Sequence, residues 1–160
     1  MRLTIAAVGR LKDGPERELY ARYAKRFDDA GRALALGPLR LAELPESRAA
    51  KPDLRKADEA ARLLKAAAGT EAVVALDARG KAMTSEALAK WIAARRDGGA
   101  KTLAFLVGGP DGHGPAALEV ATLTLSLGSL TLPHGLARVV LAEQLYRAAT
   151  IIAGHPYHRE

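Results

Sequence analysis

Short apolar runs alternate with longer, more polar segments along this chain, and this alternation limits the folds that it can adopt. Four runs have the length of strands: residues 3–8, 39–44, 72–76 and 102–107. Residues 39–44 are the weakest of the four, because they include Arg40 and Glu43, but the other three runs are almost entirely apolar instead of alternating, which is typical of strands that are buried on both faces. The pattern therefore predicts an α/β fold with a mostly parallel sheet and helices on both of its faces.

Helix signals fill the segments between these runs. A first helix is expected to begin near Pro15, because proline is tolerated in a first turn. Asp53 is predicted to cap a second helix, and Thr84 a third that continues to Arg96. A long last helix is expected over residues 136–152. No linker or repeat interrupts the series, so we expect one domain over residues 1–160.

The composition excludes several classes of protein. The 160 residues include no cysteine, which rules out disulfides, zinc fingers, iron–sulfur clusters and thiol catalysis, and which fits a reducing cytoplasm. The apolar run at residues 3–8 is too short to span a membrane, and no other segment reaches that length without charges. A net charge of +6 suits an anionic partner such as nucleic acid, although an arginine-rich proteome would also explain it.

Three segments where strands are expected to end could form a ligand site, because ligands of open α/β sheets bind at the carboxyl ends of the strands. They are residues 76–77, 108–112 and 127–132. The last segment combines leucines with Gly128, which suits a flat heteroaromatic ligand, but a bulge in a buried strand explains it as well. The paired glycines at 108–109 are also compatible with a plain tight turn.

Motifs for other chemistries are missing. The chain has no phosphate loop of the G-x-x-x-x-G-K-[ST] type, no G-x-G-x-x-G dinucleotide fingerprint and no G-x-S-x-G nucleophile elbow. His113, His134 and His155 stand apart from any cluster with metal-ligand spacing, so no metal site is predicted.

The last helix and the residues after it form an unusual end. The helix has apolar side chains on more than one side, and a second copy of the chain is the simplest partner for the additional face. His155, Tyr157, His158 and Arg159 then follow within five positions. These side chains can move protons, stack on rings and bind phosphates, although a solvated polar tail is the simpler interpretation.

Four ordered motifs together carry a family resemblance. They are Leu-Val-Gly-Gly-Pro-Asp-Gly at 106–112, Leu-Thr-Leu-Pro-His at 130–134, Arg-Val-Val-Leu-Ala-Glu-Gln-Leu-Tyr-Arg-Ala at 138–148 and His-Pro-Tyr-His-Arg at 155–159. Over essentially the whole chain, the sequence resembles the bacterial methyltransferases of the SPOUT class that modify N3 of a pseudouridine in large-subunit ribosomal RNA.

The resemblance implies a fold, a cofactor and partners. The C-terminal segment would form a trefoil knot, which is a rare exception among folds. The cofactor would be S-adenosyl-L-methionine, and the protein would be a homodimer acting on a stem-loop of 23S rRNA within the assembled ribosome. The implied cofactor-binding residues are Leu76, Gly108, Leu127, Gly128, Ser129, Leu130, Thr131 and Leu132. Family members vary at the position of Gly128, which is harmless if this contact is made through the backbone.

In such an enzyme the tail of one subunit would complete the site near the cofactor of the other. His158 is the candidate base for the acidic imide proton, because an imidazole titrates near neutral pH. Tyr157 could stack on the base or hydrogen-bond it, and Arg159 could bind a phosphate. Two rival functions remain: a hydrolase or phosphatase, for which no nucleophile or metal cluster is found, and a non-catalytic basic module that binds ribosomal RNA.

Overall fold

The structure is a computed structural model that describes residues 1–158. Its centre is a five-stranded sheet in the order β2-β1-β4-β3-β5, and every pair of neighbouring strands is parallel. The strands are β1 (Arg2–Val8), β2 (Leu39–Leu44), β3 (Ala72–Ala82), β4 (Thr102–Val107) and β5 (Leu123–Ser126). The predicted α/β class with a parallel sheet is therefore confirmed.

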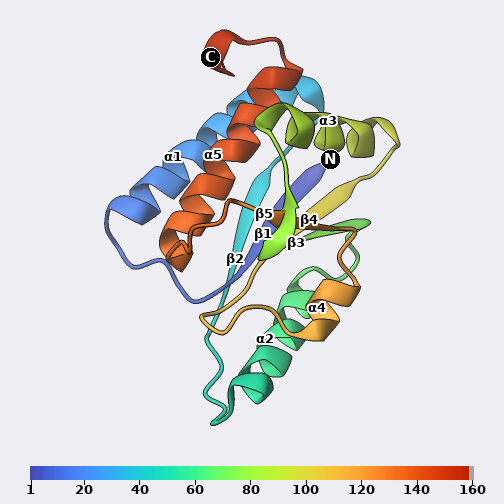
Figure 1. Cartoon of the computed structure of the whole chain (residues 1–160). Coiled ribbons are helices and arrows are strands. Elements are labelled where there is room, and N and C mark those ends of the chain that lie inside the picture. The colour runs from blue at the N-terminus through green and yellow to red at the C-terminus, as the bar shows by residue number, and fades with distance from the viewer. Residues whose placement is uncertain (159–160) are drawn as a thin grey trace.

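Helices cover both faces of the sheet, as Figure 1 shows. One layer contains α1 (Pro15–Gly31), α3 (Ser85–Asp97) and α5 (His134–Ile152), and the other contains α2 (Pro52–Ala66) and α4 (Pro115–Glu119). Two short 3-10 helices, η1 (Arg32–Leu34) and η2 (Pro156–His158), follow α1 and α5.

The alternating side chains of the central strands explain why these runs are continuously apolar. On β4, Phe105 belongs to the core beneath α1, α3 and α5, whereas its neighbour Leu106 belongs to the core beneath α2. On β1, Ile5 and Ala6 divide in the same way. All four side chains are fully buried, so a polar residue at any of these positions would require a buried hydrogen-bonding partner.

The register brings the carboxyl ends of the strands to one edge of the sheet. Val8 of β1 is level with Leu44 of β2, and Ala7 is level with Val107 of β4. Val107 is in turn level with Leu76 of β3. This edge is where a parallel sheet is expected to bind ligands, and the functional site described below is found there.

Several predicted boundaries need correction. Strand β3 continues to Ala82, because β5 pairs with it twice: Leu125 is level with both Leu76 and Lys81, and residues 77–80 bulge out between these two partners. Asp53 does not cap α2, which begins at Pro52; it lies in the first turn and pairs with Lys56. The predicted Thr84 cap is confirmed by its hydrogen bond from the Ala87 N–H.

The last helix begins at His134, two residues earlier than predicted. It packs against both α1 and α3. The trefoil knot stays a prediction, because the order and register of the strands do not test how the chain is threaded. Among the described residues, no helix combines the length and the apolar character that crossing a membrane requires.

Candidate functional site

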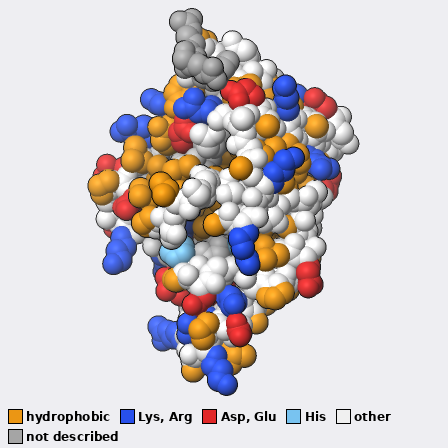
Figure 2. Space-filling model, viewed as in Figure 1, with side chains coloured by type: hydrophobic (Ala, Val, Ile, Leu, Met, Phe, Trp, Pro, Cys, Tyr) orange, Lys and Arg blue, Asp and Glu red, His pale blue; other side chains and the backbone are white. Residues whose placement is uncertain are grey.

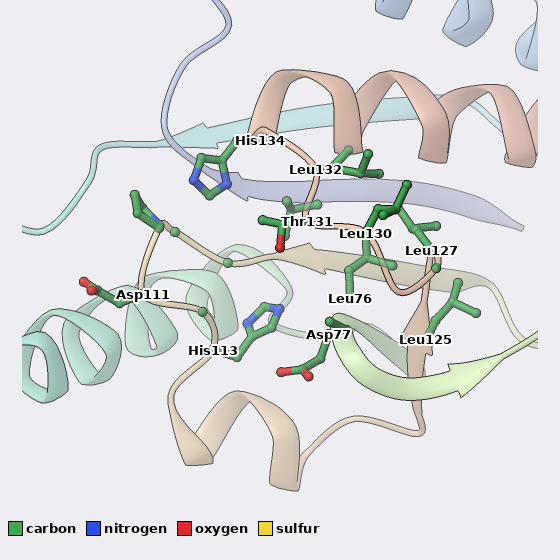
Figure 3. A pocket seen from close by; sticks show the side chains of 18 residues that line it. Leu76, Asp77, Asp111, His113, Leu125, Leu127, Leu130, Thr131, Leu132 and His134 are labelled. Atoms are coloured by element: carbon green, nitrogen blue, oxygen red, sulfur yellow. The ribbon is translucent and has the colours of Figure 1, made fainter.

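A cavity of about 380 Å³ opens at the carboxyl edge of the sheet. Three segments form its walls: the end of β3, the turn after β4 and the loop between β5 and α5 (Figure 3). They are the same strand ends that the sequence singles out. The volume lies within the range of about 300–1,000 Å³ that is usual for small-molecule sites.

The residues predicted to bind a cofactor are brought together here, with one exception. The cavity is lined by Leu76, Gly108, Leu127, Gly128, Leu130, Thr131 and Leu132, whereas Ser129 is exposed and does not line it. In Figure 3 the leucines form one apolar side of the pocket, and the Thr131 hydroxyl points into it.

The turn after β4 depends on glycine because of its tight packing. A Cβ atom on Gly109 would lie 2.4 Å from Oε2 of Glu59, a buried side chain of α2. A Cβ on Gly108 would lie 3.1 Å from the backbone carbon of Gly112, and the Gly112 N–H closes the turn by donating to the Gly109 carbonyl at 2.9 Å. At Gly108 and Gly109 the turn therefore presents backbone instead of side chains to the cavity.

The loop after β5 is organised around Gly128, whose φ of +129° is a backbone conformation that other residues rarely adopt. The Ser126 hydroxyl accepts a hydrogen bond from the Gly128 N–H at 3.2 Å and donates one to its carbonyl at 3.1 Å. Leu130 follows with 80% of its surface exposed. Its side chain therefore offers apolar surface at the mouth of the pocket.

Two carboxylates lie on the polar side of the cavity. Asp77 is hydrogen-bonded by Arg79, and Asp111 by Arg55 through Nε and Nη2 at 2.7 and 3.2 Å. The hydrogen bonds from these arginines lower the pKa values of both carboxyl groups. Both side chains are therefore ionised acceptors at neutral pH, which suits hydroxyl or ammonium groups of a ligand.

His113 forms part of the cavity wall but is itself buried. Neither ring nitrogen has a hydrogen-bond partner of good geometry within residues 1–158. Burial lowers the pKa of His113, although the neighbouring Asp77 opposes this shift. A neutral imidazole in this position is part of the packing beneath the pocket (Figure 3). Over the same described residues, no three His, Asp or Glu side chains are grouped so that they could hold a metal ion.

Tyr157 lies at the opposite end of α5, within a cluster of aromatic and charged side chains. Its hydroxyl donates to Oε1 of Glu143 at 3.1 Å, and its ring centroid lies 4.5 Å from that of Tyr146. The guanidinium of Arg147 lies 5.0 Å from the Tyr157 ring centroid and also pairs with Glu143. Burial, followed by the Glu143 carboxylate, raises the pKa of Tyr157 to about 12.

The tail and the pocket are far apart within one chain. His134, the first residue of α5, lines the pocket, whereas η2 begins after the end of the helix. Because α5 has 19 residues, these two points are separated by about 28 Å. The side chain of the candidate base, His158, and the whole of Arg159 lie outside the described residues.

The sequence prediction missed several residues of the pocket wall. Asp77, Asp111, His113 and His134 line the cavity but were not predicted as site residues. Asp77 and Asp111 directly follow or lie within the strand ends that were singled out, so the rule for parallel sheets could have included them. His134 lines the pocket because α5 begins at this residue.

Comparison with known proteins places this geometry in a family. A family model described as "Predicted SPOUT methyltransferase" matches residues 1–158. The chain therefore belongs to the SPOUT methyltransferase family. A probable methylase family protein from Haemophilus influenzae Rd KW20 has a similar structure, with a TM-score of 0.54 at 13% sequence identity over 99% of this chain and 70% of that one. That likeness concerns the fold.

Closer relatives carry a more specific name. The chain is 54% identical over 159 residues to the ribosomal RNA large subunit methyltransferase H of Brucella anthropi, with 99% of each chain covered. It is 52% identical, with the same coverage, to the protein of that name from Xanthobacter autotrophicus.

Proposed function

We propose that this protein is an S-adenosyl-L-methionine-dependent methyltransferase that methylates N3 of a pseudouridine in a stem-loop of 23S rRNA. It acts in the cytoplasm, as a homodimer, on the assembled ribosome. The observation that carries the proposal is the single pocket formed by residues from three separate strand ends. Family membership and relatives named as large-subunit rRNA methyltransferases support the assignment over nearly the full chain.

The residues of the pocket fit this cofactor. Leu127, Leu130 and Leu132 offer apolar surface to an adenine ring, and the glycine turn at 108–109 lets a ligand approach the backbone closely. The ionised Asp77 and Asp111 can accept hydrogen bonds from ribose hydroxyls or an ammonium group. When bound, the cofactor supplies an electrophilic methyl group on a sulfonium centre.

The protein's contribution to the reaction is alignment and proton removal. Holding the acceptor nitrogen in line with the methyl group can account for several kcal/mol of the barrier. His158 is our candidate for the base that takes the imide proton, and Arg159 for a contact to an RNA phosphate. If His158 is the base, His158→Ala lowers kcat and removes a pH dependence near neutrality, and a normal kcat with an unchanged pH profile would exclude that role.

For Tyr157 we propose an anchoring role. Its hydroxyl already donates to Glu143, and its ring already packs on Tyr146. Stacking on an RNA base would require the ring to leave this cluster. Tyr157 is therefore better suited to fix the direction in which the following residues leave α5.

The separation of about 28 Å along α5 supports a dimeric site. A tail that cannot reach the pocket of its own chain can reach that of a second copy, if two copies pack so that their α5 helices run in opposite directions. The exposed Leu136, in the first turn of the helix, offers apolar surface for such a contact. In Figure 2 hydrophobic side chains gather on the middle of the face shown, with Lys and Arg around them.

Mixing two inactive variants tests the composite site. One chain carries Leu130→Asp in the pocket, and the other carries His158→Ala in the tail. If the tail serves the partner's pocket, each mixed dimer has one intact site, and an equal mixture regains about a quarter of the wild-type activity. If the tail serves its own chain, no activity returns. Sedimentation showing a monomer at micromolar concentration would reject the dimer itself.

The function is tested by incubating assembled ribosomes with the protein and methyl-labelled cofactor, followed by mass spectrometry of the 23S rRNA. Label on one pseudouridine is expected. Leu130→Asp should weaken cofactor binding in calorimetry, whereas Leu54→Asp, at a 57% exposed leucine of α2, should leave it unchanged. Ribosomes that stay unlabelled while the cofactor binds would favour the non-catalytic RNA-binding module.

A further inference from the structure

A second cavity, of about 350 Å³, lies at the same edge of the sheet between the segments that follow β1 and β2. Its lining comes from two stretches, Gly9 with Arg10 and residues 45–48. The two strands end level, and the Gly9 N–H donates to the Leu44 carbonyl at 2.7 Å. Both stretches therefore leave the sheet side by side and enclose the cavity between them.

A buried cation, Arg138, lies next to the acidic residues of this region. Arg138 of α5 is 1% exposed, hydrogen-bonds the Val8 carbonyl and lies 3.3 Å from the Glu43 carboxylate. The exposed Glu46 lines the cavity and acts on the same guanidinium: burial lowers the pKa of Arg138, and the charges of Glu43 and Glu46 oppose this shift. Arg138 thus partly offsets the negative charge of both carboxylates.

Two arginines at the rim remain without a partner. Arg10 and Arg48 line the cavity from its two sides, and both are exposed. Within residues 1–158 neither forms an ion pair or a hydrogen bond, whereas Arg17, close to them along the chain, is paired with both Asp13 and Glu43. An unpaired guanidinium on each side of a cavity suits a phosphate, which accepts its forked hydrogen bonds.

The loop that carries Arg48 is held firmly by α2. Arg62 donates to the Pro45 carbonyl at 3.0 Å, and Oε1 of Glu59 accepts from the Ser47 N–H at 2.9 Å. Arg55 donates to the carbonyls of Ala49 and Ala50, at 3.2 Å each. The loop has no regular secondary structure, yet side chains from three positions of one helix fix it in place.

The same helix connects this loop to the cofactor pocket. Arg55 also pairs with Asp111, and Glu59 packs against Gly109, and both of these partners line the pocket. The second cavity lies between β1 and β2, whereas the pocket lies over β4, β3 and β5. Two to three strand spacings, or roughly 10–14 Å, therefore separate them along the sheet edge.

From this arrangement we infer that the cavity between residues 9–10 and 45–48 binds a phosphate group of the RNA strand, clamped between Arg10 and Arg48. The inference rests on the proposed function, because it takes ribosomal RNA as the substrate. It adds a subsite: a phosphodiester held here, next to a cofactor pocket built on the same helix, would fix the position of the target nucleotide along the sheet edge.

The double variant Arg10→Gln/Arg48→Gln tests this assignment. Its matched control, Arg40→Gln/Lys65→Gln, removes the same charge at the opposite end of the strands, where Arg40 is the second residue of β2 and Lys65 lies in the last turn of α2. A fluorescent RNA stem-loop with the sequence of 23S rRNA is titrated with each protein at several salt concentrations. The affinity for S-adenosyl-L-methionine is measured separately by calorimetry. For the rim variant we expect about tenfold weaker RNA binding, while cofactor affinity stays unchanged.

The salt dependence is the decisive measurement. Losing the one clamped phosphate should reduce the slope of log K against log[salt] by about 0.7 for a single strand, and KM for RNA should rise while kcat is retained. Equal losses in the rim and control variants, or an unchanged slope in the rim variant, would overturn the assignment. Because RNA binding is measured without methylation, a wild-type protein that binds RNA but transfers no methyl group would reject the proposed function and not this site.

Discussion

Replacing Gly109 with alanine would place a methyl group 2.4 Å from Oε2 and 3.0 Å from the carboxyl carbon of Glu59. Glu59 is 3% exposed and cannot turn outward freely, since its other oxygen accepts from the Ser47 N–H at 2.9 Å. Either the carboxylate shifts and the Ser47 N–H loses its acceptor, or the turn shifts into the pocket. The first outcome costs about 1–3 kcal/mol of unfolding free energy, and the second a similar amount.

Chemical denaturation of Gly109→Ala should therefore give an unfolding free energy about 1–3 kcal/mol below that of the wild type. The matched control is Gly135→Ala in the first turn of α5, where a Cβ would have its nearest neighbour at an ordinary 3.4 Å. Because alanine favours helix over glycine, the control should be neutral or up to about 1 kcal/mol more stable.

Glu59→Ala provides the test of the reasoning. Removing the carboxylate removes the clash, so Gly109→Ala should cost less than about 0.5 kcal/mol in that background. If it costs the same with and without Glu59, the contact at this turn is not the reason for glycine. Calorimetry with S-adenosyl-L-methionine on the same variants reports whether the turn has moved, because Gly109 lines the pocket.

Three further outcomes are expected. Burial lowers the pKa of His113, so the unfolded chain binds more protons than the folded one below about pH 6.5, and stability falls as the pH falls. His113→Leu should therefore lose less stability than the wild type between about pH 7.5 and about pH 5.5 in urea titrations. Equal losses would contradict this. The pKa of Tyr157, raised to about 12 by burial and then by Glu143, should move towards about 10 in Glu143→Gln, as read from tyrosinate absorbance against a Tyr157→Phe reference; an unchanged titration would show that burial alone is responsible. Arg138→Met should cost about 1–3 kcal/mol in chemical denaturation, because it removes the buried donor of the Val8 carbonyl and one partner of Glu43, which keeps Arg17 and the Leu11 N–H; a cost below about 0.5 kcal/mol would mean that water replaces the lost contacts.

The sequence predicts the centre of the sheet well because that part depends on local signals. Except for the half-buried Thr4 and Thr102, residues 3–8 and 102–107 become buried central strands, and positions buried on both faces of a sheet favour apolar side chains. The extension of β3 to Ala82 had no such signal. Residues 77–82 include charged residues and glycine, and the strand resumes at Lys81 and Ala82 because β5, more than forty positions later, pairs with these two residues.

The candidate site also combines features that local sequence signals predict with features that they do not. The apolar loop at 127–132 and the glycine turn at 108–109 carry local signals of a ligand site, and the fold brings them into one pocket. The reason for Gly109 has no local signal, since it depends on Glu59 from a different helix. The position of Tyr157 could not be predicted either, because its contacts depend on how η2 turns back onto α5.

Helix α2 gives these separate findings a common physical basis. One carboxylate oxygen of Glu59 lies against Gly109, and the other accepts a hydrogen bond from the Ser47 N–H. Arg55 likewise contacts both segments, through Asp111 and through the Ala49 carbonyl. A displacement of the Gly109 turn is therefore transmitted to Ser47 through a single buried carboxylate. If both cavities serve one reaction, Gly109→Ala should weaken RNA binding as well as cofactor binding, although Gly109 lies outside the lining of the second cavity.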